Sequence, residues 1–220
     1  RYSAVAASIE EALRLLHSEK YDKLSASQKK SLLDYLAKRW DVLRFSKDVH
    51  NIMTFNGNNQ IVTERAKIDT YGDYKNFVFA TTDLSRIDRN SVKKHLRGVA
   101  ITDDKYVVVC DEIENHSFFT EAKWAMLTPA NVRITGENTA ELSMNGEKLT
   151  IKVEGKQVKM NTWSTQPRFE FDEANPGTIM VGFTTTLAPD EKAAIKVYLI
   201  PESVSPEEIN TPPSIKAWSK

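Results

Sequence analysis

The densest cationic group in the chain is Lys93-Lys94-His95, followed closely by Arg97. Charged side chains of this kind donate strong hydrogen bonds to acidic ligands. Because neighbouring side chains of a strand point to opposite faces, Lys94 and His95 are expected on opposite sides. Such a run also fits a solvated edge strand, since lysines commonly protect sheet edges. We keep Lys94 and Arg97 as candidate ligand-binding residues beside that structural interpretation.

Histidine is a common metal ligand, and the chain contains four, of which His50 is considered first. Zinc needs about four ligands, of which three or more commonly come from protein. None of the other three, His17, His95 and His116, stands at metal-ligand spacing from His50. A histidine hydrogen-bonded to backbone or to a neighbouring carboxylate is therefore the alternative interpretation.

Two tryptophans and two tyrosines are candidates for contacts with a ligand. Trp163 stands near an expected turn and is the better candidate for an exposed stacking platform. Trp124 stands in an alternating segment, which favours core packing. Tyr71 and Tyr74 flank Gly72-Asp73, which we expect to form a loop. A loop tyrosine could transfer protons, although no histidine partner stands beside it in the sequence.

The strongly apolar run Tyr106–Cys110 leads into two carboxylates, Asp111 and Glu112. These carboxylates are expected to end the strand and solvate the next loop. A pair of catalytic or calcium-binding carboxylates is the alternative. Cys110 is the single cysteine, so no intramolecular disulfide can form. Within an apolar run it is expected to be a small buried core residue.

Composition argues against several classes of function, although a net charge of zero leaves room for a local basic cleft. The 220 residues include 30 Lys plus Arg and 30 Asp plus Glu, so the net charge is zero. A general nucleic-acid or membrane-surface binder would usually carry a basic excess. No apolar stretch approaches the length of a membrane-spanning helix. We therefore expect neither a nucleic-acid partner nor membrane insertion. The first residue is Arg1, which suggests a processed protein, a trimmed chain or a piece of a longer one.

The pattern after Phe45 predicts an all-β fold. Thirteen short segments between Val49 and Ile200 are rich in β-branched and aromatic residues and are bounded by turn signals such as Asn145-Gly146. They include Gln60–Ile68 and Arg168–Asp172. So many strands with almost no helix indicate a large antiparallel β-sandwich of two stacked sheets, similar to a supersandwich.

Short helices are expected before the sandwich and an extended tail after it. Ser8-Ile-Glu-Glu11 and Ser25-Ala-Ser-Gln28 have capping-box spacing, and apolar residues follow at helical intervals. The expected division is a helical segment over 1–45 that packs on the sandwich, the sandwich itself over 46–201, and a tail over 202–220. The tail is rich in Pro, Ser and Glu.

A series of motifs follows the same order as in a known family. In Arg39–Gln60, Arg39-Trp40 and Arg44 precede His50-Asn51, a strand and a turn that ends in Gln60. This segment resembles the beginning of the C-terminal β-sandwich of heparinase II/III-like polysaccharide lyases. The later segments that are similar to this family are Phe77–Leu84, Arg97–Glu112, Trp124–Thr128 and Asn175–Pro201.

The resemblance implies a secreted or periplasmic bacterial enzyme of two parts. An α/α toroid precedes the sandwich, and an acidic polysaccharide such as a glycosaminoglycan lies between them. A base, usually Tyr or His, removes the C5 proton of a uronic acid. Groups around the uronate carboxylate neutralise it so that this proton becomes acidic enough. With such a substrate, Arg97, Lys94 and Trp163 are the expected substrate-binding residues. The resemblance also implies a structural zinc at His50, with no other cofactor.

The toroid and the family's His-x-His segment do not occur in this sequence, so the catalytic residues are unknown. Two interpretations follow, and enzymatic activity of this chain is left open. In the first, the sandwich contributes to binding and β-elimination together with a toroid domain or partner chain. In the second, it is a non-catalytic carbohydrate-binding or structural assembly module.

Overall fold

The computed structural model describes residues 9–37, 43, 46–169 and 175–219. Arg39, Trp40 and Arg44 of the family-like segment lie outside these described residues. The chain divides into two compact units, of which the first comprises residues 1–49 and 165–176. The second comprises residues 50–164 and 177–220 and holds both β-sheets. Each unit is described by itself.

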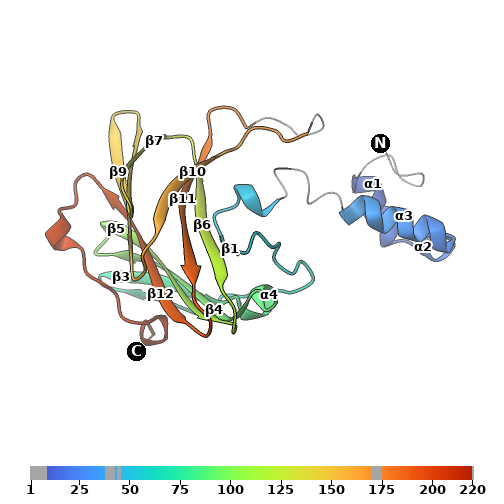
Figure 1. Cartoon of the computed structure of the whole chain (residues 1–220), viewed down its shortest axis with the longest axis horizontal. Helices are drawn as coiled ribbons and strands as arrows, with labels where there is room; N and C mark the ends of the chain where they lie inside the picture. Colours follow the sequence, from blue (N-terminus) through green and yellow to red (C-terminus); the bar gives the residue numbers. More distant parts are fainter. Residues whose placement is uncertain (1–8, 38–42, 44–45, 170–174, 220) are drawn as a thin grey trace. The chain divides into compact units, whose positions relative to one another are not determined.

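The larger unit is an antiparallel β-sandwich (Figure 1). One sheet has four strands in the order β1-β6-β11-β10, and the other has eight in the order β2-β3-β4-β5-β12-β9-β8-β7. The all-β prediction is therefore confirmed. The strands are β1 (Met53–Phe55), β2 (Thr70–Tyr74), β3 (Phe77–Asp83), β4 (Val92–Thr102), β5 (Tyr106–Asn115), β6 (Thr120–Thr128), β7 (Asn131–Gly136), β8 (Thr139–Met144), β9 (Glu147–Glu154), β10 (Lys159–Ser164), β11 (Ile179–Leu187) and β12 (Lys192–Pro201).

Alternating apolar residues of both sheets form the main core. Trp124 and Phe183 stack with ring centroids 5.9 Å apart. Facing residues of the larger sheet, such as Ile151 and Ile195, are fully buried. Alternation works here because every second side chain of a strand points to the same face. The expected core position of Trp124 is confirmed, since its exposed fraction is 3%.

Strand β4 lies inside the larger sheet, between β3 and β5. The interpretation of Lys93–Arg97 as part of a solvated edge strand is therefore wrong. Strand β5 also runs on to Asn115, so Asp111 and Glu112 do not end it. The physical reason is the long β4–β5 hairpin, whose register is regular from Lys94 to Thr102 and pairs Arg97 with Asp111. Cys110 is fully buried, as expected.

The segment before β2 differs from the prediction. No strand forms at Gln60–Ile68, whose residues are mostly exposed. The strand is instead β2, where a loop carrying Tyr71 and Tyr74 was expected. Gly72 allows this pairing, because a Cβ there would lie 2.6 Å from the ring of Phe79. Of the expected strand Arg168–Asp172, residues 168 and 169 belong to no strand, and residues 170–172 lie outside the described residues.

The smaller sheet covers only part of the larger one. The inner face of β3 and β4 carries Val78, Val99 and Ile101, with exposed fractions of 37%, 42% and 45%. Val78 pairs with Ile101 in the register, and Val99 pairs with the partly buried Val109 of β5. These three exposed side chains form an aliphatic strip, a name that we keep below.

The C-terminal residues cross the outer face of the larger sheet. They form two short 3-10 helices, η4 (Pro206–Glu208) and η5 (Ile215–Ala217). After η5, Trp218 is buried with the side chains of Phe77 and Phe79, and it meets both rings edge to face. The tail is therefore held to the sheet by an aromatic cluster.

The described residues of the smaller unit include the helices α1 (Ile9–Leu16), α2 (Glu19–Asp22) and α3 (Ala26–Ala37), and the 3-10 turn η3 (Lys47–Val49). The predicted capping box of α3 is confirmed, because Ser25 and Gln28 exchange backbone-to-side-chain hydrogen bonds. Ala12, Leu32 and Leu36 form the buried centre of this unit. Packing of these helices on the sandwich stays a prediction. None of the described helices has the length and apolar character to span a membrane.

Candidate functional site

The predicted binding residues do not come together. Arg97 and Lys94 are three positions apart on β4, so their side chains leave opposite faces of the larger sheet. Trp163 lies on β10 of the smaller sheet. His50 is exposed at a bend that follows η3. The four residues therefore do not form one site, and their individual roles stay predictions.

Arg97 belongs to a buried ion network. Its Nε and Nη2 donate to the two carboxylate oxygens of Asp111, at 2.7 and 2.9 Å. Its Nη1 donates to the backbone oxygen of Asn51 at 3.3 Å. Burial raises the pKa of Asp111, but Arg97 and the hydrogen bond from His95 outweigh it and lower the pKa to about 2. We therefore assign the Arg97 guanidinium to holding Asp111.

The same network contains His95, which is fully buried. Its Nδ1 lies 2.8 Å from Asp88 and its Nε2 lies 2.9 Å from Asp111. Sequence reasoning missed this cluster. One signal was present, because a hairpin around Asp103-Asp104 pairs Arg97 with Asp111 and alternation then puts His95 on the same face.

A zinc site at His50 does not fit the residues that the structure describes. Among them, no group of three or more His, Cys, Asp or Glu could hold a metal ion. A structural zinc needs about four ligands. Zinc binding by His50 therefore stays a prediction that requires ligands from outside the described part of the chain.

The outer face of the smaller sheet gathers polar side chains. Lys159 of β10 lies directly opposite Thr184 of β11, which in turn lies opposite Lys123 of β6. Two residues further along β10, Asn161 lies opposite Gly182. Two residues beyond Asn161 on the same strand, Trp163 lies opposite Met180 of β11. We call the surface formed by Lys123, Lys159, Asn161, Trp163 and Thr184 the lysine face.

Trp163 and Lys123 are in direct contact on the lysine face. The Lys123 ammonium lies 4.1 Å from the ring centroid of Trp163. A cation over the face of an indole ring is attracted by the ring quadrupole. Trp163 is half-buried, and the Lys123 ammonium lies over its ring. Its role as a stacking platform stays a prediction.

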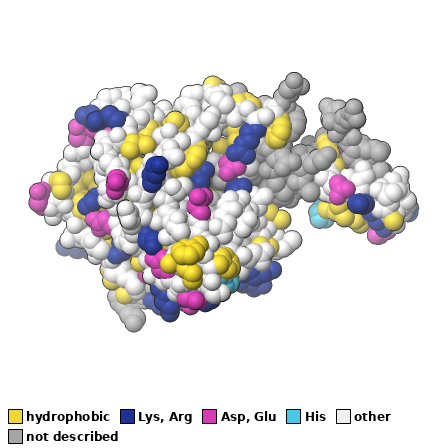
Figure 2. All heavy atoms as spheres, in the orientation of Figure 1, with side chains coloured by type: hydrophobic (Ala, Val, Ile, Leu, Met, Phe, Trp, Pro, Cys, Tyr) yellow, Lys and Arg dark blue, Asp and Glu magenta, His cyan; other side chains and the backbone are white. Residues whose placement is uncertain are grey.

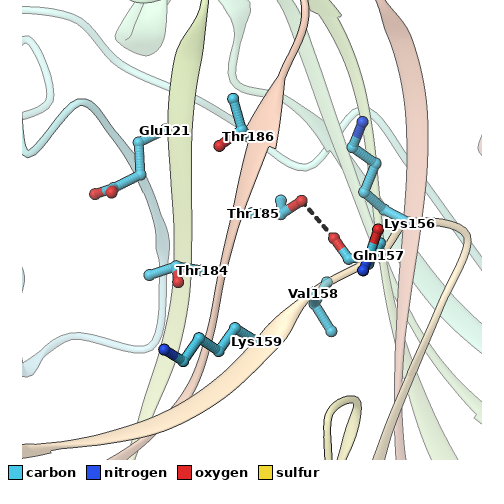
Figure 3. Close-up of a pocket in the computed structure, with 8 residues that line it drawn as sticks. All are labelled: Glu121, Lys156, Gln157, Val158, Lys159, Thr184, Thr185 and Thr186. Carbon is cyan, nitrogen blue, oxygen red and sulfur yellow. Dashed lines mark hydrogen bonds between the residues drawn. The ribbon is translucent and has the colours of Figure 1, made fainter.

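A groove of about 400 Å³ continues from the lysine face. In Figure 3 the threonines of β11 lie between Glu121 on one side and Lys159 on the other. Thr185 donates to the backbone oxygen of Gln157 at 2.6 Å, which fixes the chain leading into β10. The lining residues are Glu121, Lys156, Gln157, Val158, Lys159, Thr184, Thr185 and Thr186.

The groove and the lysine face share a chemistry of ammonium, hydroxyl and amide groups. Lys156 pairs with Glu191, whereas within the described residues no carboxylate pairs with the exposed Lys159. Glu121 is the one acidic residue of the lining. Figure 2 shows cationic and anionic side chains interspersed over the visible surface, so the cationic character is local. This arrangement suits a polar ligand that bears acidic groups.

Together these features define a large two-sheet β-sandwich with a polar, lysine-bearing sheet face. Its fold is that of the sandwich in heparinase III structures. A heparinase III crystal structure matches with a TM-score of 0.56 and 16% identity, over 72% of this chain and 24% of the other. The heparan sulfate lyase HepC from Pedobacter heparinus matches with a TM-score of 0.54 and 15% identity, over 83% and 27%.

The match confirms the predicted resemblance at the level of the fold. A heparinase III with methylated lysines gives a TM-score of 0.54 at 18% identity, over 70% of this chain and 24% of the other. The similarity falls on the C-terminal part of those proteins. This chain therefore spans about a quarter of the length of the structures that it matches. No protein-family model and no curated protein sequence matches it.

Proposed function

We propose that this chain is the β-sandwich part of a polysaccharide lyase-like protein and binds a uronic-acid-containing acidic polysaccharide on the lysine face. The observation that carries the proposal is the contact between Lys123 of β6 and Trp163 of β10. Lys159, also on β10, adds a second ammonium group to the same face. The fold shared with heparinase III supports the class of ligand. A secreted or periplasmic location belongs to the same proposal.

The physical basis is a combination of charge and shape. The ammonium groups of Lys123 and Lys159 attract carboxylate and sulfate groups, and this attraction weakens with salt because both lysines are at the surface. The exposed part of the Trp163 indole, which Lys123 does not cover, offers a rigid contact area to a sugar ring. Thr184 adds a hydroxyl between the lysines that can donate to or accept from a sugar.

Catalysis is assigned to a partner in this proposal. The lining of the groove contains neither histidine nor tyrosine, so it holds no base of the type expected for C5 proton removal. Among the described histidines, His95 is enclosed between two carboxylates. An α/α toroid, in the same polypeptide or in a partner chain, would supply the base and acid for β-elimination.

The same observation favours a second candidate, a non-catalytic carbohydrate-binding module. The two candidates are separated by the effect of the sandwich on turnover. Both predict binding by the purified 220-residue chain, and only the first predicts that a toroid partner forms unsaturated uronate faster when the sandwich is present. Absorbance of the uronate double bond measures this product.

Binding is tested with heparan sulfate, heparin and alginate by titration calorimetry. We expect Lys159→Ala to weaken binding by about three- to tenfold, as loss of one charged contact does. Lys75→Ala is the matched control, because Lys75 is an exposed lysine in the turn between β2 and β3. An equal effect of both substitutions, or no binding of any of the three polysaccharides, would refute the proposal.

A further inference from the structure

The imidazole of His95 lies between two carboxylates. Each ring nitrogen is within 2.9 Å of a carboxylate oxygen, from Asp88 at the end of α4 (Ser85–Asp88) and from Asp111 on β5. A neutral imidazole has one N–H and one lone pair. It would therefore direct a lone pair at one of the two carboxylates, and only the imidazolium donates to both.

The charges around His95 balance when it is protonated. Asp88 and Asp111 face it from α4 and β5, and Arg97 of its own strand pairs with Asp111. From β1 the uncharged ring of Phe55 meets it edge to face, with centroids 5.3 Å apart. Two cations and two anions then sum to zero, which makes their burial tolerable.

His95 is also the attachment point of α4. Its backbone N–H donates to Ser85 Oγ at 3.0 Å, and its carbonyl accepts from the Leu84 N–H at 2.8 Å. Together with the contact between His95 and Asp88, these bonds fasten both ends of the short helix to β4. A four-residue helix has little stability of its own, so it depends on such contacts.

Helix α4 in turn holds the irregular segment of residues 61–64. The Ile61 N–H donates to the carbonyl of Ile87 at 3.0 Å. Glu64 pairs with both Arg86 and Arg89. The proton of His95 therefore supports the contact between β4 and α4, and α4 in turn makes the contacts that hold this segment.

We propose that His95 is a pH-dependent clasp, whose ring proton holds α4 and residues 61–64 against β4 and whose loss at alkaline pH releases them while the two sheets stay folded. Release is local because the sheets are held by the separate apolar core around Trp124 and Phe183.

The direction of the pH effect follows from the surroundings of the ring. Burial lowers the pKa of His95, but hydrogen bonds to Asp111 and Asp88 outweigh it, so the pKa is raised above the usual 6.5. A group with a raised pKa contributes its full stability below the unfolded value. That stability is lost as the pH rises from about 6.5 through the folded pKa.

The first test is nitrogen NMR of the imidazole in the full chain. We expect both ring nitrogens of His95 to be protonated at pH 7. Amide exchange should then show protection factors of residues 61–64 and 84–88 falling at alkaline pH, while those of β11 stay constant. A neutral, single-tautomer His95 at pH 7 would overturn the proposal. Loss of protection in step with β11 would also overturn it.

Two variants and one control complete the test. Asp88→Asn removes one carboxylate and should shift the loss of protection to lower pH. His95→Gln cannot be charged and should leave residues 61–64 and 84–88 poorly protected at every pH. If His95→Gln does not fold, Asp88→Asn alone decides, and an unchanged midpoint refutes the clasp. His17→Gln, at an exposed histidine of the smaller unit, should leave the pH profile unchanged.

Discussion

Gly98 lies directly beneath the ring of Trp218. A Cβ at Gly98 would come within 2.5 Å of Cζ3 of this ring, which is too close for any side chain. Strand β4 therefore needs glycine at this position for the C-terminal residues to pack on the sheet. A contact between residues 120 positions apart thus fastens the end of the chain to the sandwich.

The first prediction concerns this contact. Gly98→Ala should lower the free energy of unfolding by about 1–3 kcal/mol, because overpacking forces the indole or the strand to move. Urea denaturation followed by tryptophan fluorescence measures the change. In a Trp218→Ala background the cost of Gly98→Ala should largely disappear. Equal costs in both backgrounds would show that the indole is not the cause.

A second prediction concerns the buried carboxylate of Asp111. Asp111→Asn leaves the cations of Arg97 and His95 without their shared partner, so unfolding free energy should fall by about 3–5 kcal/mol. Chemical denaturation at neutral pH measures it. Glu147→Gln, at an exposed position at the start of β9, is the control and should change stability by less than about 0.5 kcal/mol. Similar losses in both variants would contradict the network.

The third prediction concerns the free energy of unfolding at acid pH, which also depends on Asp111. Asp111 has its pKa lowered from 3.8 to about 2, so it contributes stability that is present above pH 3.8. This contribution is lost as the pH falls through about 2. Unfolding free energy should therefore decline between these pH values, and Asp111→Asn should show a shallower decline. Parallel curves for the two proteins would assign the acid sensitivity to other groups.

A fourth prediction separates the two parts of the lysine face. Trp163→Leu should weaken polysaccharide binding by about two- to tenfold, the range expected for one aromatic contact. This loss should persist at high salt, whereas the loss in Lys159→Ala should shrink because surface charges are screened. Calorimetry at two ionic strengths measures both. If the two losses depend on salt in the same way, Trp163 does not contact a sugar ring.

Cys110 gives a fifth prediction. Burial raises the pKa of its thiol to about 12, with the neighbouring Asp111 adding to the shift, so the reactive thiolate is scarce. The native protein should resist a thiol reagent at pH 8, and labelling should follow release of the C-terminal residues from the outer face of the larger sheet. Trp218→Ala should accelerate labelling, because Trp218 belongs to the same buried cluster as Cys110. Rapid labelling of the native chain would show that the outer face of the sheet is open.

Local pattern was sufficient for most of the fold. Alternation predicted the core position of Trp124, and the apolar run Tyr106–Cys110 predicted that of Cys110. The turn signal Asn145-Gly146 falls between β8 and β9. Local pattern failed at Gln60–Ile68, where β-forming residues make too few buried contacts to form a strand. It failed again at β2, which pairs because Phe79 fits over Gly72. Such a fit depends on tertiary packing rather than on local propensity.

The candidate site was less accessible from the sequence. Trp163 was identified, but its partner Lys123 stands 40 positions earlier in another strand. The contact requires the order β6-β11-β10, which no local signal contains. The sequence likewise did not predict Asp88 as a partner of His95, because the short helix α4 that carries Asp88 was not expected. Both cases depend on which strands and helices become neighbours.

The aliphatic strip of Val78, Val99 and Ile101 has a consequence for handling the protein. Exposed apolar side chains gathered on one sheet face favour association between molecules, and a net charge of zero provides little long-range repulsion to oppose it. The adjoining edge strand β2 carries no lysine or proline to discourage strand pairing. Colloidal stability should therefore be lowest near neutral pH and improve when the molecule acquires charge of either sign.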